Sequence, residues 1–200
     1  MKRFVIVVDT QADFMNADGA LPVDGAGDLI APMQVWLASL RPAQTAGVLF
    51  TFDSHFADTY PGSAEAEQFP IHCVHRTPGW ENVLDPDVID PAIPVYRLEK
   101  GVFDMWAEFD LVVEAAASGG KVVRDAFFAE LQARGITEVT VVGVAADYCV
   151  RWAIDGLVAR DFTVEVPTGL TRGIARPIEQ VVAEDFANVP VRLGFAAGRT

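Results

Sequence analysis

The chain has 200 residues but only two cysteines, Cys73 and Cys149, which lie far apart in the sequence. So few cysteines exclude the disulfide framework that holds small secreted domains together. We expect two separate thiols in a reducing compartment.

Long hydrophobic runs are also absent. The apolar run at residues 4–8 ends at Asp9, and no small-residue cleavage site follows it. This run is too short for the core of a signal peptide or for a membrane span. The N-terminal sequence therefore predicts a cytoplasmic protein.

Positive charge is scarce. Fifteen Lys and Arg residues stand against 28 Asp and Glu residues, which gives a formal net charge of −13. A field of this sign repels a phosphate backbone and an anionic membrane surface. We therefore expect neither nucleic acid nor a membrane as a partner, and a small neutral or cationic molecule as the ligand.

Apolar sequence, in contrast, is plentiful, since 51% of the residues are hydrophobic. No linker divides the chain, so we predict one domain over residues 1–200. Runs typical of buried strands occur at residues 4–8, 47–52, 139–144, 163–166 and 189–192. Apolar stripes at helical spacing follow Asp28, which we expect to cap the first helix, surround Phe127, begin at Val150 and follow Pro177.

The strand-like runs are continuous rather than alternating, which suits a parallel sheet that is covered on both faces. Strands and helices also alternate along the chain. This order predicts an α/β fold: a doubly wound, Rossmann-like, mostly parallel sheet with helices on both faces. We interpret residues 115–120 as an exposed connector.

Residues 53–94 break this rhythm, and the three histidines of the chain, His55, His72 and His75, all lie there. Asp53 and His55 are two positions apart at the end of a strand, so their side chains share a face. Imidazole and carboxylate groups suit zinc, iron or manganese. A solvated loop is the alternative, but the clustering favours a metal site. The available additional oxygen ligands are Asp58, Glu65 and Glu67.

Cys149 follows the predicted strand 139–144 through a turn of small residues, and a helix is expected to begin at or near Asp147. Ligands bind at the carboxyl ends of strands in α/β sheets. The positive end of the helix dipole lowers the pKa of a thiol in the first turn, and the free N–H groups there can hold an oxyanion. A lone cysteine is usually a small buried hydrophobe, but this setting favours a nucleophile.

Two further residues, Asp9 and Lys100, each have a structural and a functional interpretation. Asp9 ends the first predicted strand, where it can cap a helix or act as a general base. Lys100 is compatible with an ordinary surface charge, but an ammonium beside a thiol would stabilise a thiolate and an oxyanion. Cys73 is expected to pack beside a metal ligand, and Asp13 to be structural.

Three motifs, in order, resemble those of the isochorismatase-like cysteine hydrolases, and within them the nicotinamidases. They are Val-Asp-Thr-Gln-Ala-Asp-Phe at residues 8–14, Lys-Gly at residues 100–101, and Gly-Val-Ala-Ala-Asp-Tyr-Cys-Val at residues 143–150. The resemblance implies a catalytic triad of Asp9, Lys100 and Cys149. It also implies a cis peptide bond between Val144 and Ala145, and an oxyanion hole formed by the N–H groups of Ala145 and Cys149.

Nicotinamidases carry a metal near the triad. The resemblance maps the ligands of this metal onto Asp53, His55 and His72, with Glu65 as the further ligand and Glu67 as its alternative. The metal would be zinc, iron or manganese. His75 has no counterpart in the family and is expected to surround the site or to lie on the surface.

The sequence departs from the family at two positions near the motifs. Ala12 stands where relatives often have Asn, and Tyr148 where some have His, and both changes can reshape the pocket. The candidate pocket walls, which are equally compatible with core packing, are Phe14, Phe69, Trp106, Val144 and Tyr148.

The resemblance implies a homo-oligomer that hydrolyses nicotinamide, or a close amide such as pyrazinamide, to the acid and ammonia through a cysteine thioester. A metal ion would position the ring. Two alternatives stay open. One is a metal-independent amidohydrolase of the same family that acts on a carbamoyl, ureido or other small amide. The other is a non-catalytic binding protein on the same fold.

Overall fold

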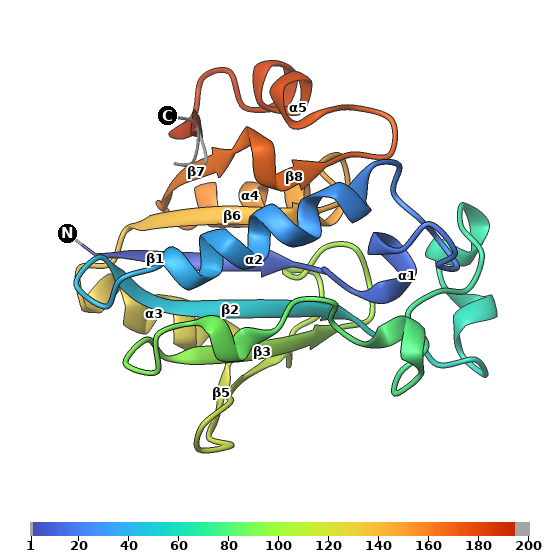
Figure 1. Ribbon diagram of the computed structural model, residues 1–200, viewed down its shortest axis with the longest axis horizontal. Coiled ribbons are helices and arrows are strands. Elements are labelled where there is room, and N and C mark those ends of the chain that lie inside the picture. Colours follow the sequence, from blue (N-terminus) through green and yellow to red (C-terminus); the bar gives the residue numbers. More distant parts are fainter. Residues whose placement is uncertain (1, 195–200) are drawn as a thin grey trace.

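The computed structural model describes residues 2–194 and is built around one nine-stranded sheet (Figure 1). The strand order is β5-β4-β3-β2-β1-β6-β7-β9, and β8 also pairs with β6. The strands are β1 (Arg3–Val8), β2 (Thr45–Asp53), β3 (Val95–Lys100), β4 (Val112–Ala115), β5 (Lys121–Val123), β6 (Glu138–Val144), β7 (Thr163–Pro167), β8 (Thr171–Arg172) and β9 (Val191–Gly194). The helices are α1 (Ala12–Met15), α2 (Ile30–Ser39), α3 (Arg124–Ala133), α4 (Cys149–Val158) and α5 (Ile178–Asp185).

The centre of the sheet is parallel. Strand β1 pairs in parallel with β2 and β6, and the parallel pairing continues to β3 on one side and to β7 and β9 on the other. Strand β4 pairs antiparallel with both of its neighbours, β3 and β5, so β5 runs in the same direction as β3. The predicted α/β fold with a mostly parallel sheet is confirmed.

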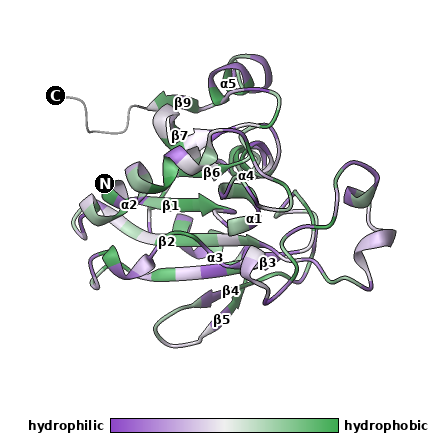
Figure 2. Ribbon diagram, turned by 45° about the vertical axis from the view of Figure 1, so that its right-hand side comes forward, coloured by the Kyte–Doolittle hydropathy of each residue, from purple (hydrophilic) through white to green (hydrophobic). Residues whose placement is uncertain are grey.

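Two hydrophobic cores lie on the two faces of the sheet. Successive side chains of a strand point to opposite faces, so Val5 and Val7 of β1 pack with α2 on one face. Phe4, Ile6 and Val8 pack with α3, α4 and α5 on the other. Figure 2 shows apolar residues gathered in the central strands. Burial on both faces explains why β1 is a continuous apolar run.

Four of the predicted helices are present, but two of their starts differ from the prediction. A 3-10 turn over Ala26–Leu29 precedes α2, so Asp28 does not cap that helix. Helix α4 begins at Cys149. The side chain of Asp147 instead accepts hydrogen bonds from three N–H groups of the chain after β8, at residues 174–176.

The sequence did not reveal β3, β4 and β5. These strands form one side of the sheet, where a face is open to solvent, so polar and apolar residues are mixed in them. The predicted connector at residues 115–120 is in fact the turn of the β4–β5 hairpin, with Gly119 in the left-handed region (φ 67°).

The irregular segment between β2 and β3 contains 3-10 turns at Tyr60–Gly62, Glu65–Glu67, Pro78–Trp80 and Pro86–Val88. The first half of this segment lies beyond the carboxyl ends of β1 and β2, at the right of Figure 1. It thus covers the edge of the sheet where ligands bind in α/β proteins. Within the described residues, every helix is too short or too polar to cross a membrane.

Candidate active site and metal centre

Four chemically active side chains come from neighbouring strand ends. Asp9 directly follows β1, Asp53 ends β2, Lys100 ends β3, and Cys149 lies beyond β6 at the start of α4. Asp53 and Lys100 are paired in the β2–β3 register. Because β1, β2, β3 and β6 are parallel neighbours, their carboxyl ends meet at one edge, and residues distant in sequence lie together there.

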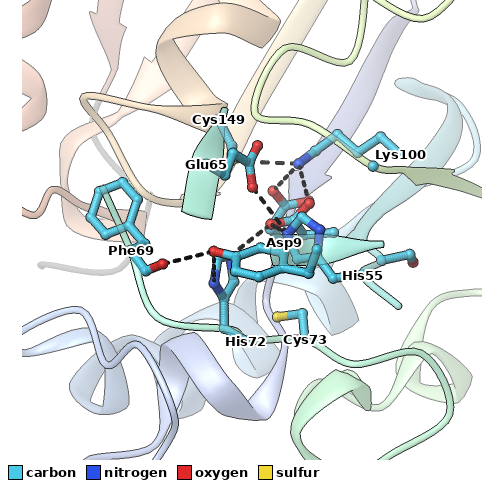
Figure 3. Close-up of polar contacts among 12 residues, drawn as sticks. Asp9, His55, Glu65, Phe69, His72, Cys73, Lys100 and Cys149 are labelled. Carbon is cyan, nitrogen blue, oxygen red and sulfur yellow. Dashed lines mark hydrogen bonds and ion pairs between the residues drawn. The ribbon is translucent and has the colours of Figure 1, made fainter. Parts of the chain in front are cut away.

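The ammonium of Lys100 is the centre of this group (Figure 3). Its Nζ lies 2.8 Å from Oδ2 of Asp9, 3.3 Å from Oδ1 of Asp53 and 3.5 Å from Sγ of Cys149. Relative exposure is 0% for Asp9, 2% for Lys100 and 5% for Cys149. The three residues of the predicted triad are therefore in contact through Lys100 and removed from water.

Thr51 of β2 fixes the orientation of Asp9. The Asp9 N–H donates to Oγ1 of Thr51 at 3.2 Å, and the Thr51 hydroxyl donates to Oδ1 of Asp9 at 2.6 Å. Asp9 has φ 47°, a left-handed conformation that Asp tolerates better than most residues. One carboxylate oxygen is thus held by Thr51, and the other faces Lys100. This role of Thr51 was not predicted from the sequence.

Burial and charge act in opposite directions on Lys100. Burial alone would lower the pKa of the ammonium, but the charges of Asp53 and Asp9 outweigh it, and the pKa rises well above its usual value. Lys100 is therefore a permanent cation at physiological pH.

The thiol of Cys149 behaves differently from the expectation. Burial raises its pKa well above the usual value, Asp9 and Asp53 add to the increase, and Lys100 only partly opposes it. The predicted lowering by the helix dipole is wrong, because desolvation and two carboxylates outweigh one ammonium and a helix end. The resting thiol keeps its proton, and it needs a base at the moment of attack.

The turn before α4 presents two backbone donors. The Val144–Ala145 peptide bond is cis, as the resemblance implied. Gly143 has φ 113°, and a Cβ there would lie 2.1 Å from the carbonyl oxygen of Val8, so only glycine fits. The N–H groups of Ala145 and Cys149 donate to no backbone acceptor within residues 2–194. Both are free to bind a developing negative charge.

A second cluster adjoins the triad. Asp53, His55, Glu65 and His72 are buried, and one potential ligand atom from each lies within 4.8 Å of the others. His55 Nε2 lies 3.2 Å from Asp53 Oδ2 and 3.0 Å from Glu65 Oε2. His72 Nε2 also lies 3.2 Å from Asp53 Oδ2. These are the four residues predicted to bind a metal. The alternative ligand, Glu67, is exposed.

Two observations show that a cation fits these four residues. Within the described chain, Oε1 of buried Glu65 has no hydrogen-bond partner, and Oε2 has only the contact with His55 Nε2 at 3.0 Å. His72 Nδ1 lies 2.8 Å from the carbonyl oxygen of Pro70, which assigns the ring proton to Nδ1. The unprotonated Nε2 then faces Asp53 Oδ2, so two acceptors oppose each other. A divalent ion between them would satisfy both.

The charges of the cluster also favour a bound cation. Burial alone would raise the pKa of Asp53, but Lys100 and His55 hold it below its usual range. Burial would lower the pKa of His55, but Asp53 and Glu65 raise it to about 9. The cluster therefore attracts positive charge, which a metal ion would supply with release of the His55 proton.

Three aromatic rings pack together near Cys149. Phe69 lies 5.7 Å from Phe103 and 5.3 Å from Tyr148, and Phe103 lies 5.3 Å from Tyr148, measured between ring centroids. Phe14 packs at 5.2 Å against the ring of His72. The predicted wall residues Phe69, Tyr148 and Phe14 thus surround the two clusters. Phe103 was missed because the strand before it was not recognised.

The remaining predicted wall residues are less directly placed. Val144 is fully buried in the core on the α2 face. Trp106 packs against Phe128 at 4.9 Å and lies against Gly156, where a Cβ would be 2.1 Å from its ring. These contacts with α3 and α4 indicate that Trp106 is a packing residue and not a pocket wall.

Three other residues named from the sequence lie outside both clusters. Cys73 is buried, its pKa is raised by burial, and its N–H donates to Oδ2 of Asp13 at 2.7 Å. Asp13 also accepts from the N–H of Ala20, in keeping with a structural role. His75 Nε2 lies 3.3 Å from Oε2 of Glu99, beside the rings of Phe56 and Trp80.

A cavity of about 470 Å³ gives access to this region from outside. Its lining includes Glu99 and Lys100 of β3 and His55, together with Tyr60 and Glu108 of the surrounding loops. The cavity therefore adjoins the triad and the metal cluster at one wall.

Fold and site together define a class: an α/β protein with a buried Asp–Lys–Cys group and a candidate metal centre at the carboxyl edge of its parallel sheet. The chain belongs to the isochorismatase domain family, whose model matches residues 3–176.

Within this family, the chain is similar to proteins of stated activity. The chain is 29% identical over 194 residues to the nicotinamidase/pyrazinamidase of Mycobacterium tuberculosis, covering 96% of this chain and 97% of the relative. Among solved structures, the pyrazinamidase of Pyrococcus horikoshii in complex with zinc superposes with a TM-score of 0.71 at 24% identity, covering 98% of this chain and 99% of that one. The N-carbamoylsarcosine amidase of Thermoplasma acidophilum gives a TM-score of 0.71 at 20% identity, covering 100% and 99%.

Proposed function

We propose that the protein is a metal-dependent cysteine amidohydrolase that converts nicotinamide, or a close amide such as pyrazinamide, to the acid and ammonia. The observation that carries the proposal is the position of Lys100. Its ammonium contacts Asp9 and Cys149 on one side and the candidate metal ligand Asp53 on the other. The similarity to nicotinamidases and pyrazinamidases supports the substrate class.

In the first step, the carboxylate of Asp9 takes the proton of the Cys149 thiol as the sulfur attacks the amide carbon. A C–S bond forms, and the carbonyl electron pair moves to the oxygen. Asp9 then returns the proton to the amide nitrogen, the C–N bond breaks, and ammonia leaves. Water hydrolyses the resulting thioester, which releases the acid and restores the thiol.

Lys100 and the turn before α4 stabilise the charges that appear on this path. The permanent ammonium offsets the negative charge of Asp9 before the proton moves and the negative charge of the sulfur afterwards. The N–H groups of Ala145 and Cys149 bind the oxyanion, and loss of one such donor typically costs about 3 kcal/mol. No rearrangement of the backbone is needed, because both donors are already free.

The ring of the substrate is placed by the second cluster. Asp53, His55, Glu65 and His72 would hold a divalent ion, and zinc, iron and manganese all suit these donors. When bound, the ion supplies a Lewis acid that can coordinate a ring nitrogen. The aromatic side chains of Phe14, Phe69, Phe103 and Tyr148 would exclude water from the ring.

The test is ammonia release from nicotinamide, pyrazinamide and a carbamoyl amide, each with and without a chelator. We expect turnover of the two aromatic amides, strong loss of that turnover on chelation, and recovery when metal is restored. Turnover of none of the three amides by metal-loaded protein would contradict the proposal.

A second candidate is a metal-independent amidase that acts on a carbamoyl or ureido group. It is favoured by the similarity to N-carbamoylsarcosine amidase, which matches the chain as fully as the zinc-bound pyrazinamidase does. This candidate predicts turnover of the carbamoyl amide that a chelator does not change. A non-catalytic binding protein would show no turnover with any substrate.

A further inference from the structure

Arg124 is a buried cation outside the two clusters. It is only 2% exposed and begins α3, where the positive end of the helix dipole opposes its charge. Within residues 2–194 its one carboxylate partner is Asp125, whose side chain is 56% exposed and lies 3.0 Å from Nε. Burying a charge is unfavourable unless hydrogen bonds replace water. The hydrogen-bond partners of the guanidinium therefore show which segment of the chain it holds in place.

Those partners are main-chain carbonyl groups of the loop between β3 and β4. Nη1 of Arg124 donates to the oxygen of Met105 at 2.5 Å and to that of Glu108 at 2.7 Å. The backbone N–H of Arg124 donates to the oxygen of Leu111 at 2.8 Å. One residue therefore fixes the loop at three points, all of them outside secondary structure.

This loop begins immediately after Lys100. The side chain of Glu108 returns to its start, where Oε2 accepts the N–H of Gly101 at 2.7 Å. The same loop carries Phe103, which packs on Phe69 and Tyr148. The guanidinium of Arg124 is thus connected through Glu108 to the residue that follows the ammonium, and through the loop to an aromatic wall.

We propose that Arg124 is a positioning residue: its buried guanidinium fixes the loop of residues 101–111, and so holds Lys100 and Phe103 in the geometry needed for amide hydrolysis. The proposal rests on the proposed function. Lys100 must meet Asp9 and Cys149 together, and a displacement of about 1 Å in such a group lowers the rate about a hundredfold.

The chain offers a matched control in Arg160. Its guanidinium stacks on the same Trp106 ring at 4.0 Å, compared with 5.3 Å for Arg124, and contacts the same Asp125 at 3.2 Å. Its main-chain acceptor is Gly156 of α4, not the loop of residues 101–111. Arg160→Met removes a comparable contact with Trp106 and a comparable ion pair with Asp125, and it leaves the hydrogen bonds from Arg124 to the carbonyl groups of Met105 and Glu108 in place.

The experiment measures kcat, KM and thermal stability for Arg124→Met, Arg124→Lys, Glu108→Ala and Arg160→Met. Glu108→Ala frees only Gly101, so we expect kcat to fall about tenfold with KM nearly unchanged. Arg124→Met also frees Phe103, so kcat falls at least as far and KM rises severalfold. Arg124→Lys, which keeps the charge and one donor, falls between Arg124→Met and the wild type. Arg160→Met stays within about twofold of the wild type.

The double variant Arg124→Met/Glu108→Ala separates positioning from simple loss of stability. If both residues act through Gly101, the two effects on kcat are not additive. Fully additive effects, or a wild-type kcat and KM in a folded Arg124→Met protein, would overturn the proposal. If Arg124→Met does not fold, Arg124→Lys decides in its place, and wild-type kinetics there would overturn it equally.

Hydrogen exchange of the loop gives a reading that needs no substrate. Arg124→Met and Glu108→Ala should both speed exchange of the Gly101 amide, and Arg160→Met should not. If the wild type turns over no amide, the proposed function fails, while the exchange data still test the attachment of the loop. Unchanged exchange in both loop variants would refute the positioning role even in an active enzyme.

Discussion

The protein holds charged side chains together in two contrasting places. At the carboxyl edge of the sheet, Lys100 lies 2.8 Å from Asp9, with both groups buried. On the outer surface of α4 and α5, Arg151 lies 2.6 Å from Asp185, and Arg176 lies 2.9 Å from the same carboxylate, with all three side chains partly exposed. The distances are similar, so distance alone does not determine how much each ion pair contributes to stability.

The difference lies in the solvent. Around Arg151, Arg176 and Asp185, water can replace each lost partner, so a single ion pair contributes little. Around Lys100 no water replaces the ammonium, and its loss would leave Asp9 and Asp53 as buried carboxylates facing each other. The loss of one member of the buried group would therefore destabilise the others. Burying these charges also costs stability, and a structural role alone does not explain that cost.

The largest expected effect on stability comes from replacing one cation of each group by methionine. Lys100→Met should lower the free energy of unfolding by about 3–5 kcal/mol, because it leaves buried charge without a partner. Arg151→Met should lower it by less than about 1 kcal/mol. Denaturant unfolding of the two variants measures the comparison, and equal losses would show that burial is not what distinguishes the groups.

The second prediction concerns the metal ligands. Glu65→Gln removes a buried carboxylate from the cluster and should weaken binding of zinc or manganese by at least about tenfold. Glu67→Gln, two residues away and exposed, is the matched control and should bind as the wild type does. Calorimetric titration of the metal-free proteins measures both, and equal affinities for the two variants would remove Glu65 from the ligand set.

The third prediction concerns the Cys149 thiol and pH. Because burial and the neighbouring carboxylates raise its pKa, the thiol is protonated at pH 7, and alkylation by iodoacetamide should be slower there than for a free cysteine. The rate should rise steeply as pH increases. Cys149→Ala measures the background from Cys73. Rapid labelling that is already constant below pH 7 would show that the thiolate is the resting form.

The smallest effect is expected on the surface. Arg176 and Arg151 lower the pKa of Asp185, so its ion pairs stabilise the fold at neutral pH and lose that effect as pH falls. Asp185→Asn should therefore be less stable than the wild type at about pH 6, and the gap should be smaller at about pH 3. Thermal unfolding at both values tests this, and a gap independent of pH would contradict it.

The central strands and the candidate site could be predicted from the sequence because both produce patterns that are visible in short stretches of it. Strand β1 is buried on both faces and is therefore a continuous apolar run. Asp53, His55, Glu65 and His72 were named because histidines and acids are rare neighbours in an irregular segment, and the structure brings their ligand atoms together. The triad residues Asp9, Lys100 and Cys149 were named through motifs and are in contact.

What could not be predicted depends on contacts between distant segments. Strand β3 faces solvent in part, so it carries polar residues and was not recognised, and Phe103 beyond it was missed as well. Trp106 was assigned to the pocket, but its position is decided by Gly156, which lies 50 residues later and has no side chain. The raised pKa of Cys149 follows from its burial and from the proximity of Asp9 and Asp53, and both exist only in the fold.

The most direct test of the proposed chemistry compares the two thiols of the chain. Ammonia release from nicotinamide should fall to the uncatalysed level in Cys149→Ala, with the thermal unfolding midpoint little changed. Cys73→Ala, which also removes a buried thiol near the metal cluster, should keep most of the wild-type rate. Ammonia release by Cys149→Ala at a rate comparable to the wild type would contradict the assignment of the nucleophile, and with it the proposed reaction.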